Sequence, residues 1–445
     1  MQANNYSCIS SIGNVTASFS NIVGISGNIT TLQVATAYNF PTSNGANVKV
    51  GIFSGGNGFI YSDLVASLSN LGIASPPTIT TISIDGGGTF DGNINNPAND
   101  SLENTLDLYC VASIVPSANI VIFVGNNAST QSGIVSNWTN IINRMVAENC
   151  DVISISYAID EYYGLGPFLE TPLANAAAKG ITVLAASGDY GSEGNQNLGL
   201  YGPDSAAYPA TSPNVIAVGG TILNLTSANI RSSEVAPYAS GGGISTLFSV
   251  PAWQNGRTYN TFNGITNGPT VTLTTGTLGN IGGNLIGRGV PDISAPFQSY
   301  DFWFGGNIVT GVYGTSASTP ILAGLIARVI SLNGGRRPIV GNNTSSIHSI
   351  LYSNASGFYD ITSGNNDDYN LTGYAATSGW DAVTGLGAPW GNVLYPMITS
   401  GGTKVKSTDG SWHYVSNVKV KTASNTWSNV KAIWTKTING WNQTY

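Results

Sequence analysis

The chain has few charged residues and few histidines. Only 8% of its 445 residues are Asp, Glu, Lys or Arg, and its formal net charge is −7. So little basic surface excludes a nucleic-acid-binding protein. When the carboxylates are protonated, only 15 Lys and Arg and two His carry charge, so repulsion between charges in acid should be weak. The composition is therefore compatible with an acidic medium.

Cysteine is also scarce, because Cys8, Cys110 and Cys150 are too few for a disulfide scaffold. A Cys110–Cys150 bridge would leave Cys8 unpaired, and the sequence alone leaves the pairing open. Pro116 or Arg328 interrupts the apolar runs well short of a membrane span, so none is predicted. No signal segment opens the chain, so a secreted protein would be represented by a processed form.

Glycosylation sequons are dense, which favours a secreted, extracellular glycoprotein. They begin at Asn5, Asn14, Asn28, Asn127, Asn137, Asn224, Asn342, Asn343, Asn354, Asn370 and Asn442.

Apolar strand-like runs alternate with helical runs after a polar N-terminal extension over residues 1–30. Fully apolar runs suit strands that are covered on both faces, so we expect an α/β fold with a parallel sheet flanked by helices. The expected strands are Val48–Ser54, Thr78–Ile84, Asn119–Gly125, Asp151–Tyr157 and Ile181–Ser187. The expected helices are Thr31–Tyr38, Ser62–Leu71, Ser101–Ile114, Val135–Ala147 and Pro172–Lys179. The main domain is expected to cover residues 31–399.

Three carboxylates follow strands of this sheet, where ligands bind in such folds. Glu103 and Asp107 are four residues apart on one predicted helix, so they share a face and can share a proton. Asp189 directly follows an apolar strand. The alternatives are an exposed acidic helix turn for the pair and an Asx turn for Asp189.

A candidate nucleophile, Ser316, lies in the Gly-bounded segment Gly314–Pro320 before an apolar helical run. Small neighbours and a helix N-terminus suit attack on a carbonyl. The alternative is that Ser316 and Ser318 are helix N-caps, with Pro320 at a first helical position. Neither His348 nor His413 follows a strand of the sheet, so the base for Ser316 should be a carboxylate.

Taken in order, several segments resemble the sedolisins, the serine-carboxyl peptidases with a subtilisin-like fold, and most of all their kumamolisin-like secreted members. The likeness runs from about Leu32 to about Pro396 and excludes the first thirty residues and the tail. Its pieces are Leu32–Pro41, Glu103–Asp107, Ser187–Ser192, Tyr208–Pro213, Gly241–Gly243, Arg288–Asp292, Gly314–Ser318 and Gly379–Gly387.

The resemblance implies a peptidase acting on polypeptides, with Ser316 as nucleophile and Glu103 as general base. Asp107 would orient Glu103 and share its proton. Asp189 would be a protonated oxyanion-hole donor, so activity should be maximal in acid and collapse towards neutrality. The implied mode is endopeptidase; alternatives are a tripeptidyl exopeptidase of the same family and an inactive surface or assembly glycoprotein.

The resemblance also implies a calcium ion as cofactor. Its ligands would be the carboxylates of two aspartates and three main-chain carbonyls, which are hard oxygen donors. The residues are Asp360, Ile361, Thr377, Gly379 and Asp381. The alternative is a pair of Asp-stabilised turns.

The chain departs from the family pattern at Ser54 and Tyr157, where some members have a further Glu and a Trp. The pKa of Glu103 would then be tuned differently. The family's long N-terminal propeptide has no counterpart here, which agrees with a mature form.

The tail, residues 400–445, carries Trp412, Trp427 and Trp441 at near-even spacing and six of the fifteen Lys and Arg. We predict two copies of a short β-hairpin unit in a small C-terminal β appendage. The unit is either a stacking appendage or an attachment module for a glycan or protein surface.

Overall fold

A computed structural model of the chain describes most residues between 28 and 399 and short strands outside that range. The described residues are 7–8, 11–12, 28–93, 100–161, 164–192, 206–263, 273–278, 280–281, 284–285, 287–335, 337–338, 346–367, 372–399, 404–406, 412–414, 419–421, 427–429, 434–437 and 440–443. The sequons at Asn5, Asn14, Asn342, Asn343 and Asn370 lie outside them.

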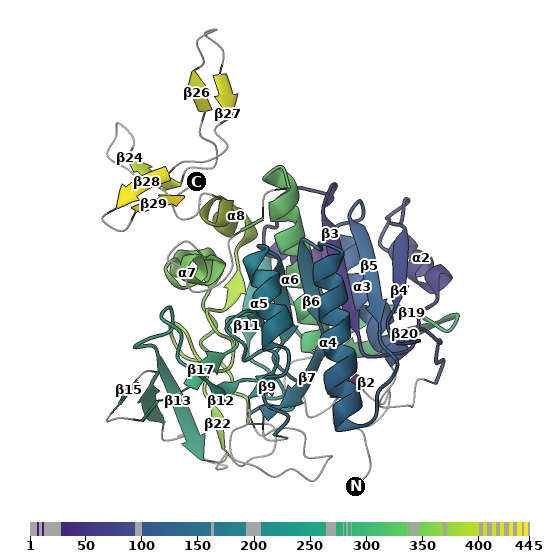
Figure 1. Cartoon of the computed structure of the whole chain (residues 1–445), viewed down its shortest axis with the longest axis horizontal. Helices are drawn as coiled ribbons and strands as arrows, with labels where there is room; N and C mark the ends of the chain where they lie inside the picture. Colours follow the sequence, from purple (N-terminus) through teal and green to yellow (C-terminus); the bar gives the residue numbers. More distant parts are fainter. Residues whose placement is uncertain are drawn as a thin grey trace.

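A mostly parallel sheet of eight strands forms the centre of the molecule (Figure 1). Its strand order is β11 (Arg231–Val235), β10 (Ile216–Leu225), β8 (Thr182–Ala186), β6 (Val152–Ile155), β3 (Lys49–Ser54), β5 (Asn119–Val124) and β4 (Ile79–Ser83), and β18 (Ile293–Pro296) also pairs with β10. Only the β10–β11 pair is antiparallel. The expected α/β fold with a parallel sheet is confirmed.

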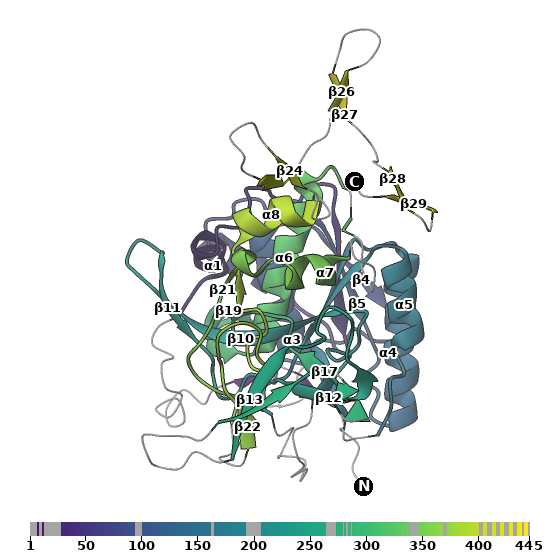
Figure 2. The ribbon, with the colours of Figure 1, turned by 90° about the vertical axis from the view of Figure 1, so that its left-hand side faces the viewer.

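Helices cover both faces of this sheet (Figures 1 and 2). One face carries α1 (Thr31–Ala37), α2 (Tyr61–Asn70), α3 (Asp100–Ile114) and α6 (Thr315–Leu332), and the other carries α4 (Gln131–Ala147) and α5 (Glu170–Ala178). Strand residues alternate between the two cores: Ile120 and Ile122 belong to the first, and Val121 and Phe123 to the second. The period of two along each strand produces this division.

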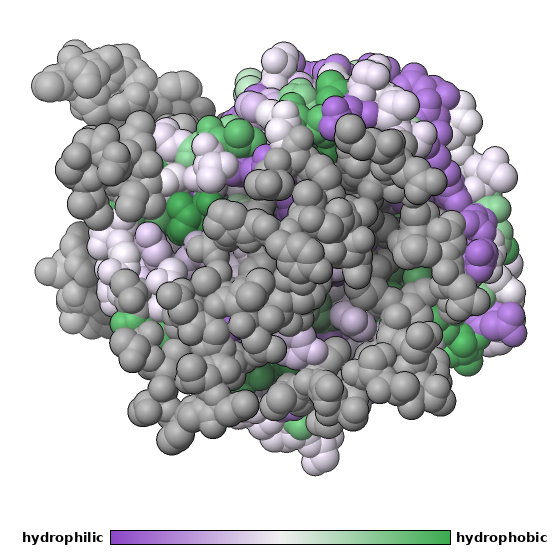
Figure 3. All heavy atoms as spheres, turned by 90° about the horizontal axis from the view of Figure 1, so that it is seen from below, coloured by the Kyte–Doolittle hydropathy of each residue, from purple (hydrophilic) through white to green (hydrophobic). Residues whose placement is uncertain are grey.

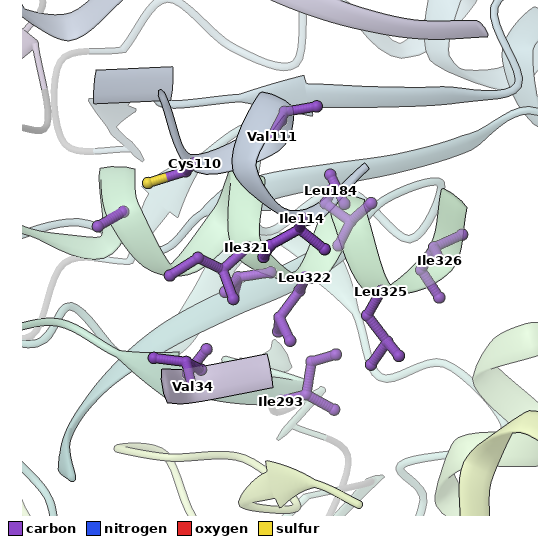
Figure 4. Close-up of a cluster of buried hydrophobic side chains, with 14 of the residues drawn as sticks. Val34, Cys110, Val111, Ile114, Leu184, Ile293, Ile321, Leu322, Leu325 and Ile326 are labelled. Carbon is purple, nitrogen blue, oxygen red and sulfur yellow. The ribbon is translucent and has the colours of Figure 1, made fainter. Parts of the chain in front are cut away.

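Two central helices, α3 and α6, pack closely together (Figure 4). Gly324 permits this approach, because a Cβ atom there would lie 2.7 Å from Cγ2 of Ile114. Every residue of α3 is buried, its acidic residues included. Helix α6 is also apolar and long enough to cross a membrane, the one such helix among the described residues, but 83% of its apolar window is buried inside the protein.

Smaller elements surround the sheet. They are β9 (Ala207–Tyr208), β12 (Gly243–Ser249), β13 (Thr258–Asn263), β14 (Thr274–Thr277), β15 (Asn280–Ile281), β16 (Asn284–Leu285), β17 (Gly287–Val290), β19 (Tyr300–Phe304), β20 (Asn307–Tyr313), α7 (Ile347–Tyr352), a 3₁₀ turn at Ala355–Gly357, β21 (Phe358–Tyr359), β22 (Thr372–Tyr374), β23 (Ala388–Pro389) and α8 (Gly391–Thr399). The coloured part of the face in Figure 3 mixes hydrophilic and hydrophobic residues.

Several sequence expectations need correction. The possible Cys110–Cys150 bridge is absent, because the two thiols are free and belong to the separate cores on the two faces of the sheet. Asn137 is only 2% exposed, so this sequon cannot carry a glycan in the folded chain. Pro320 is inside α6 rather than at its first position, and Ser316 and Ser318 are not N-caps.

The N-terminal extension contributes two short strands to other sheets. Strand β1 (Ser7–Cys8) pairs antiparallel with β7 (Tyr157–Asp160), with Cys8 opposite Tyr157. Strand β2 (Ser11–Ile12) pairs antiparallel with β20, with Ser11 opposite Tyr313. The extension therefore adds backbone strands beside β7 and β20.

The tail forms three hairpins, where the sequence reasoning predicted two. Strand β24 (Lys404–Lys406) pairs with β25 (Trp412–Tyr414), and β26 (Lys419–Lys421) pairs with β27 (Trp427–Asn429). The third hairpin joins β28 (Trp434–Thr437) to β29 (Gly440–Gln443). The first strand of this hairpin begins with Trp434, whereas the first strands of the other two hairpins begin with lysine. The third copy of the unit was therefore not recognised from the sequence.

Candidate active site

Ser316 is the second residue of α6 and is fully buried. The N-cap residue of the helix is Gly314, whose φ of 141° is a conformation that residues with a side chain rarely adopt. The N–H group of Gly314 donates to the carbonyl of Phe297 at 2.9 Å, which fixes the turn before the helix. The serine therefore lies at a helix N-terminus on a turn that glycine makes possible.

The Asp189 carboxyl group lies against the same helix end. It comes two residues after Ser187, beyond the carboxyl end of β8, and is 5% exposed. Its Oδ1 atom accepts hydrogen bonds from the N–H and the hydroxyl group of Thr315, both at 2.8 Å. Thr315 thus holds Asp189 next to the start of α6, one residue before the predicted nucleophile Ser316. The sequence reasoning missed this role of Thr315, because a threonine before a serine has no distinguishing pattern.

Glu103 and Asp107 lie on α3, both fully buried. The Ser156 hydroxyl, between β6 and β7, donates to Oδ1 of Asp107 at 2.7 Å and lies 3.4 Å from the main-chain oxygen of Ser316. Ser156 therefore links the acidic face of α3 to the start of α6. Sequence reasoning also missed Ser156, since only the fold brings the end of β6 to both helices.

The protonation of this pair is set by its surroundings. Burial is the main cause that raises the pKa of Asp107 well above its ordinary value, and the negative charge of Glu103 raises it further. The hydrogen bond from Ser156 acts in the opposite direction. A carboxyl group that keeps its proton beside a second carboxylate is what a shared-proton pair requires. The alternative of an exposed acidic turn is wrong for these two residues.

A third acid, Asp100, extends the face of α3 and was not predicted. It is 1% exposed, lies three residues before Glu103, and accepts a hydrogen bond of 3.0 Å from the Tyr157 hydroxyl. Burial raises its pKa to about 7, the bond from Tyr157 lowers it, and the charge of Glu103 raises it again. Gly56 leaves room for this carboxyl, because a Cβ atom there would come within 2.8 Å of Oδ2 of Asp100.

The family-pattern departures at Ser54 and Tyr157 have distinct outcomes. The Ser54 hydroxyl donates to the carbonyl of Gly56 at 2.7 Å, so it braces the loop after β3. The Tyr157 hydroxyl donates a hydrogen bond to the carboxyl group of Asp100. The buried acid at this end of the helix is therefore supplied by α3 itself, and the helix expected from the sequence began one residue after it, at Ser101.

His348 does not supply a base here. His348 is buried, stacks on Trp253 with ring centroids 4.5 Å apart, and its Nε2 atom lies 2.9 Å from the carbonyl of Val215. Burial lowers its pKa. His413 is in the tail strand β25. This leaves the carboxylates as the candidate bases near Ser316.

The predicted calcium ligands come from two loops that are in contact. Oδ2 of Asp360 accepts hydrogen bonds from Gly379 N–H at 2.9 Å and from the Ser378 hydroxyl at 3.2 Å. Oδ2 of Asp381 accepts from Thr377 N–H at 2.9 Å. The segment 377–381 therefore contacts Asp360, and Ile361 beside it is buried.

The predicted ligands are oxygen atoms, the donor type that calcium prefers. Burial raises the pKa of Asp381 to about 7. Among the described residues no ion pair involves Asp360 or Asp381. Nor do three or more His, Cys, Asp or Glu gather there as a metal-binding group. A cation would have to use main-chain carbonyls as well, which suits calcium.

Comparison with known proteins places the chain in a family. It matches the model of the subtilase family over residues 87–387. It is 32% identical over 390 residues to kumamolisin of Bacillus sp. (strain MN-32), covering 83% of this chain and 64% of that protein. Sedolisin of Pseudomonas sp. (strain 101) is 32% identical over 371 residues, covering 77% of this chain and 56% of that protein. Tripeptidyl-peptidase 1 of Rattus norvegicus is 31% identical over 250 residues, 54% of this chain and 41% of that protein.

The chain thus spans less than two thirds of the length of each of these relatives. The chain also matches a solved structure, with a TM-score of 0.64 and 27% identity. This is the structure of Pseudomonas sedolisin, a serine-carboxyl proteinase, complexed with two molecules of pseudo-iodotyrostatin. The match covers 84% of this chain and 99% of that chain. The family model covers well over half of this chain, so the chain belongs to the subtilase family and, within it, to the kumamolisin-like sedolisins.

Proposed function

We propose that the chain is an acid-acting serine-carboxyl endopeptidase with Ser316 as nucleophile. The observation that carries this proposal is the convergence on the start of α6: Asp189 contacts Thr315, and Asp107 reaches the Ser316 backbone through Ser156. Glu103 on the same face of α3 is the general base. It takes the proton of the Ser316 hydroxyl as that oxygen attacks the substrate carbonyl, and later gives it to the leaving amine.

The remaining groups stabilise this reaction. Asp107 shares a proton with Glu103 and orients it. Asp189, protonated in acid, donates a hydrogen bond to the oxyanion of the tetrahedral intermediate together with the N–H group of Ser316. Because a deprotonated Asp189 would repel that oxyanion, activity is expected to fall as the pH rises towards neutrality.

The test compares wild type with Ser316→Ala on an unfolded protein substrate at about pH 3, where an acidic base works. Wild type should cleave and the variant should not. Equal cleavage by the two, or none by either, would contradict the proposal; no cleavage by either would favour an inactive surface glycoprotein on this fold.

Endopeptidase action is preferred because an extended chain can lie along both strands beside the site. The extension pairs first with β7 and then with β20, which ends three residues before Ser316. A substrate pairing in the same way would continue on both sides of the serine. The competing mode is removal of tripeptides from free N-termini, which the name of one relative suggests. Cleavage of an N-terminally blocked peptide separates the modes, because a tripeptidyl exopeptidase leaves it intact.

We also propose a calcium ion held by Asp360 and Asp381 with the carbonyls of Ile361, Thr377 and Gly379. Bound calcium would cross-link the two loops and stabilise the fold near the C-terminal end of the domain. Adding a chelator should lower the melting temperature of wild type by several degrees, and an Asp381→Asn variant should show no such change. An equal effect of chelator on both proteins would remove the site from consideration.

Secretion, a glycosylated surface and attachment by the tail are further parts of the proposal. Density of sequons supports the first two, with Asn137 excluded by its burial. If the tail serves attachment alone, removal of residues 400–445 should leave the cleavage rate of a soluble peptide unchanged. A large loss of that rate would instead make the tail part of the catalytic unit.

A further inference from the structure

The three tail hairpins repeat one arrangement of lysine and tryptophan. The first strand of each places a lysine directly opposite a tryptophan of the second strand: Lys406 opposite Trp412, Lys421 opposite Trp427, and Lys436 opposite Trp441. The three lysines are fifteen residues apart. The tail is therefore a threefold repeat of one hairpin unit.

The backbone register places more residues of the same kind on that face. Directly opposite residues of an antiparallel pair, and residues two apart on one strand, share a face. Each such face consequently holds cations with aromatic rings. The faces are Lys404, Lys406, Trp412 and Tyr414; Lys419, Lys421, Trp427 and Asn429; and Trp434, Lys436, Trp441 and Gln443.

The charge of the tail is opposite to that of the rest of the chain. Residues 400–445 hold six lysines and one aspartate, a formal charge of +5. Since the whole chain carries −7, residues 1–399 carry −12. A negatively charged surface would therefore attract the tail, whose lysines keep their charge in acid, and at neutral pH it would also repel the main domain.

We propose that the tail is a trivalent docking module for an acidic polysaccharide. Lysines pair with the anionic groups, and tryptophan rings stack on sugar rings, whose apolar faces suit aromatic surfaces. Three weak units on one chain bind together far more tightly than one. Since the proposed peptidase acts in acid, where carboxylates lose their charge, sulfate esters are the anions that would still be recognised. The choice of sulfate rests on the proposed function; the docking itself does not.

The experiment uses full-length Ser316→Ala protein, so that binding is measured without cleavage. Beads bearing dextran sulfate are the probe and beads bearing uncharged dextran are the matched control. The protein should be retained on dextran sulfate and not on dextran. Its Kd should rise at least tenfold between about 50 mM and about 500 mM salt, because salt screens exposed charges.

Two alanine triple variants, with a Lys→Arg triple variant as control, separate a built face from general attraction between charges. Lys406→Ala, Lys421→Ala and Lys436→Ala together should weaken binding at least tenfold, while Lys→Arg at the same positions should preserve it. Replacing Trp412, Trp427 and Trp441 by alanine keeps the charge of +5 and should also weaken binding at least tenfold. In the wild-type background, unchanged cleavage of a soluble peptide by each variant would show an intact main domain.

Several outcomes would overturn the docking proposal whatever the result for peptidase activity. They are equal retention on dextran, unchanged binding by either alanine triple variant, and tighter binding to double-stranded DNA than to dextran sulfate. Loss of binding in steps, as single hairpins are altered one after another, is the result expected of three units that act together.

Discussion

At the scale of single residues, the contact of Thr315 with Asp189 leads to a prediction about catalysis. Thr315→Val removes the hydroxyl bond of 2.8 Å to Asp189 and keeps the bond from the main-chain N–H group. Asp189 would be held less firmly where the oxyanion forms, so kcat should fall about tenfold, which is typical when a positioning contact is lost. Steady-state kinetics on a soluble peptide checks this.

The matched control for that variant is Thr315→Ser, which keeps the hydroxyl group and should retain most of the activity. A fall in kcat in the Ser variant as large as that in the Val variant would contradict this role of the hydroxyl bond, because the Ser variant keeps that bond. Serine is smaller than threonine, and valine has the same branched shape, so neither substitution should overfill the buried site.

Sequence reasoning could identify the residues of the site that sit in local patterns and missed those that only the fold assembles. Ser316 follows a glycine turn, and Glu103 and Asp107 have helical spacing. Ser156 lies 49 residues from Asp107 and 160 from Ser316 along the chain, so no local pattern could connect them. Asp100 has the sequence context of an ordinary acidic helix start, and burial alone distinguishes it.

At the scale of elements, the two N-terminal strands predict competition with substrate. They pair with β7, which directly follows Ser156, and with β20, which ends three residues before Ser316. An extended substrate would need the same strand edges. Removing residues 1–27 should therefore lower KM for a long peptide severalfold, with a smaller change in kcat.

A synthetic peptide with the sequence of residues 1–27, added to the truncated protein, should inhibit competitively. A peptide of the same composition in scrambled order is its control. If truncation leaves KM unchanged, or if both peptides inhibit equally, the extension does not compete for these edges.

The strands of the central sheet could be predicted well because their sequences are continuous apolar runs, which indicate burial on both faces. Each expected strand of the sheet agrees with an observed strand to within two residues, since a continuous apolar run has few other solutions in a parallel sheet. Two features were out of reach. The separation of β6 from β7 depends on sheet pairing, and the close approach of α3 to α6 depends on Gly324, which resembles any other small residue in an apolar helix.

At the scale of the whole molecule, two properties favour stability in acid. The chain has at most 17 cationic side chains, so repulsion stays small when the carboxylates are protonated. Its buried acids act in the same direction. The pKa of Asp100 is about 7 in the fold, against about 3.9 for an unfolded aspartate. Its contribution to folding is therefore fully present below about pH 4 and is lost as the pH rises through about 7.

The free energy of unfolding should consequently decrease from about pH 4 to about pH 7, by on the order of 2 kcal/mol or more from this residue. Urea unfolding of the Ser316→Ala protein at several pH values measures the slope without self-cleavage. Asp100→Asn cannot ionise at this position, so it should flatten the slope. A protein that is more stable at neutral pH than in acid would contradict the argument, because neither its sparse cations nor its buried acids could then dominate the response to pH.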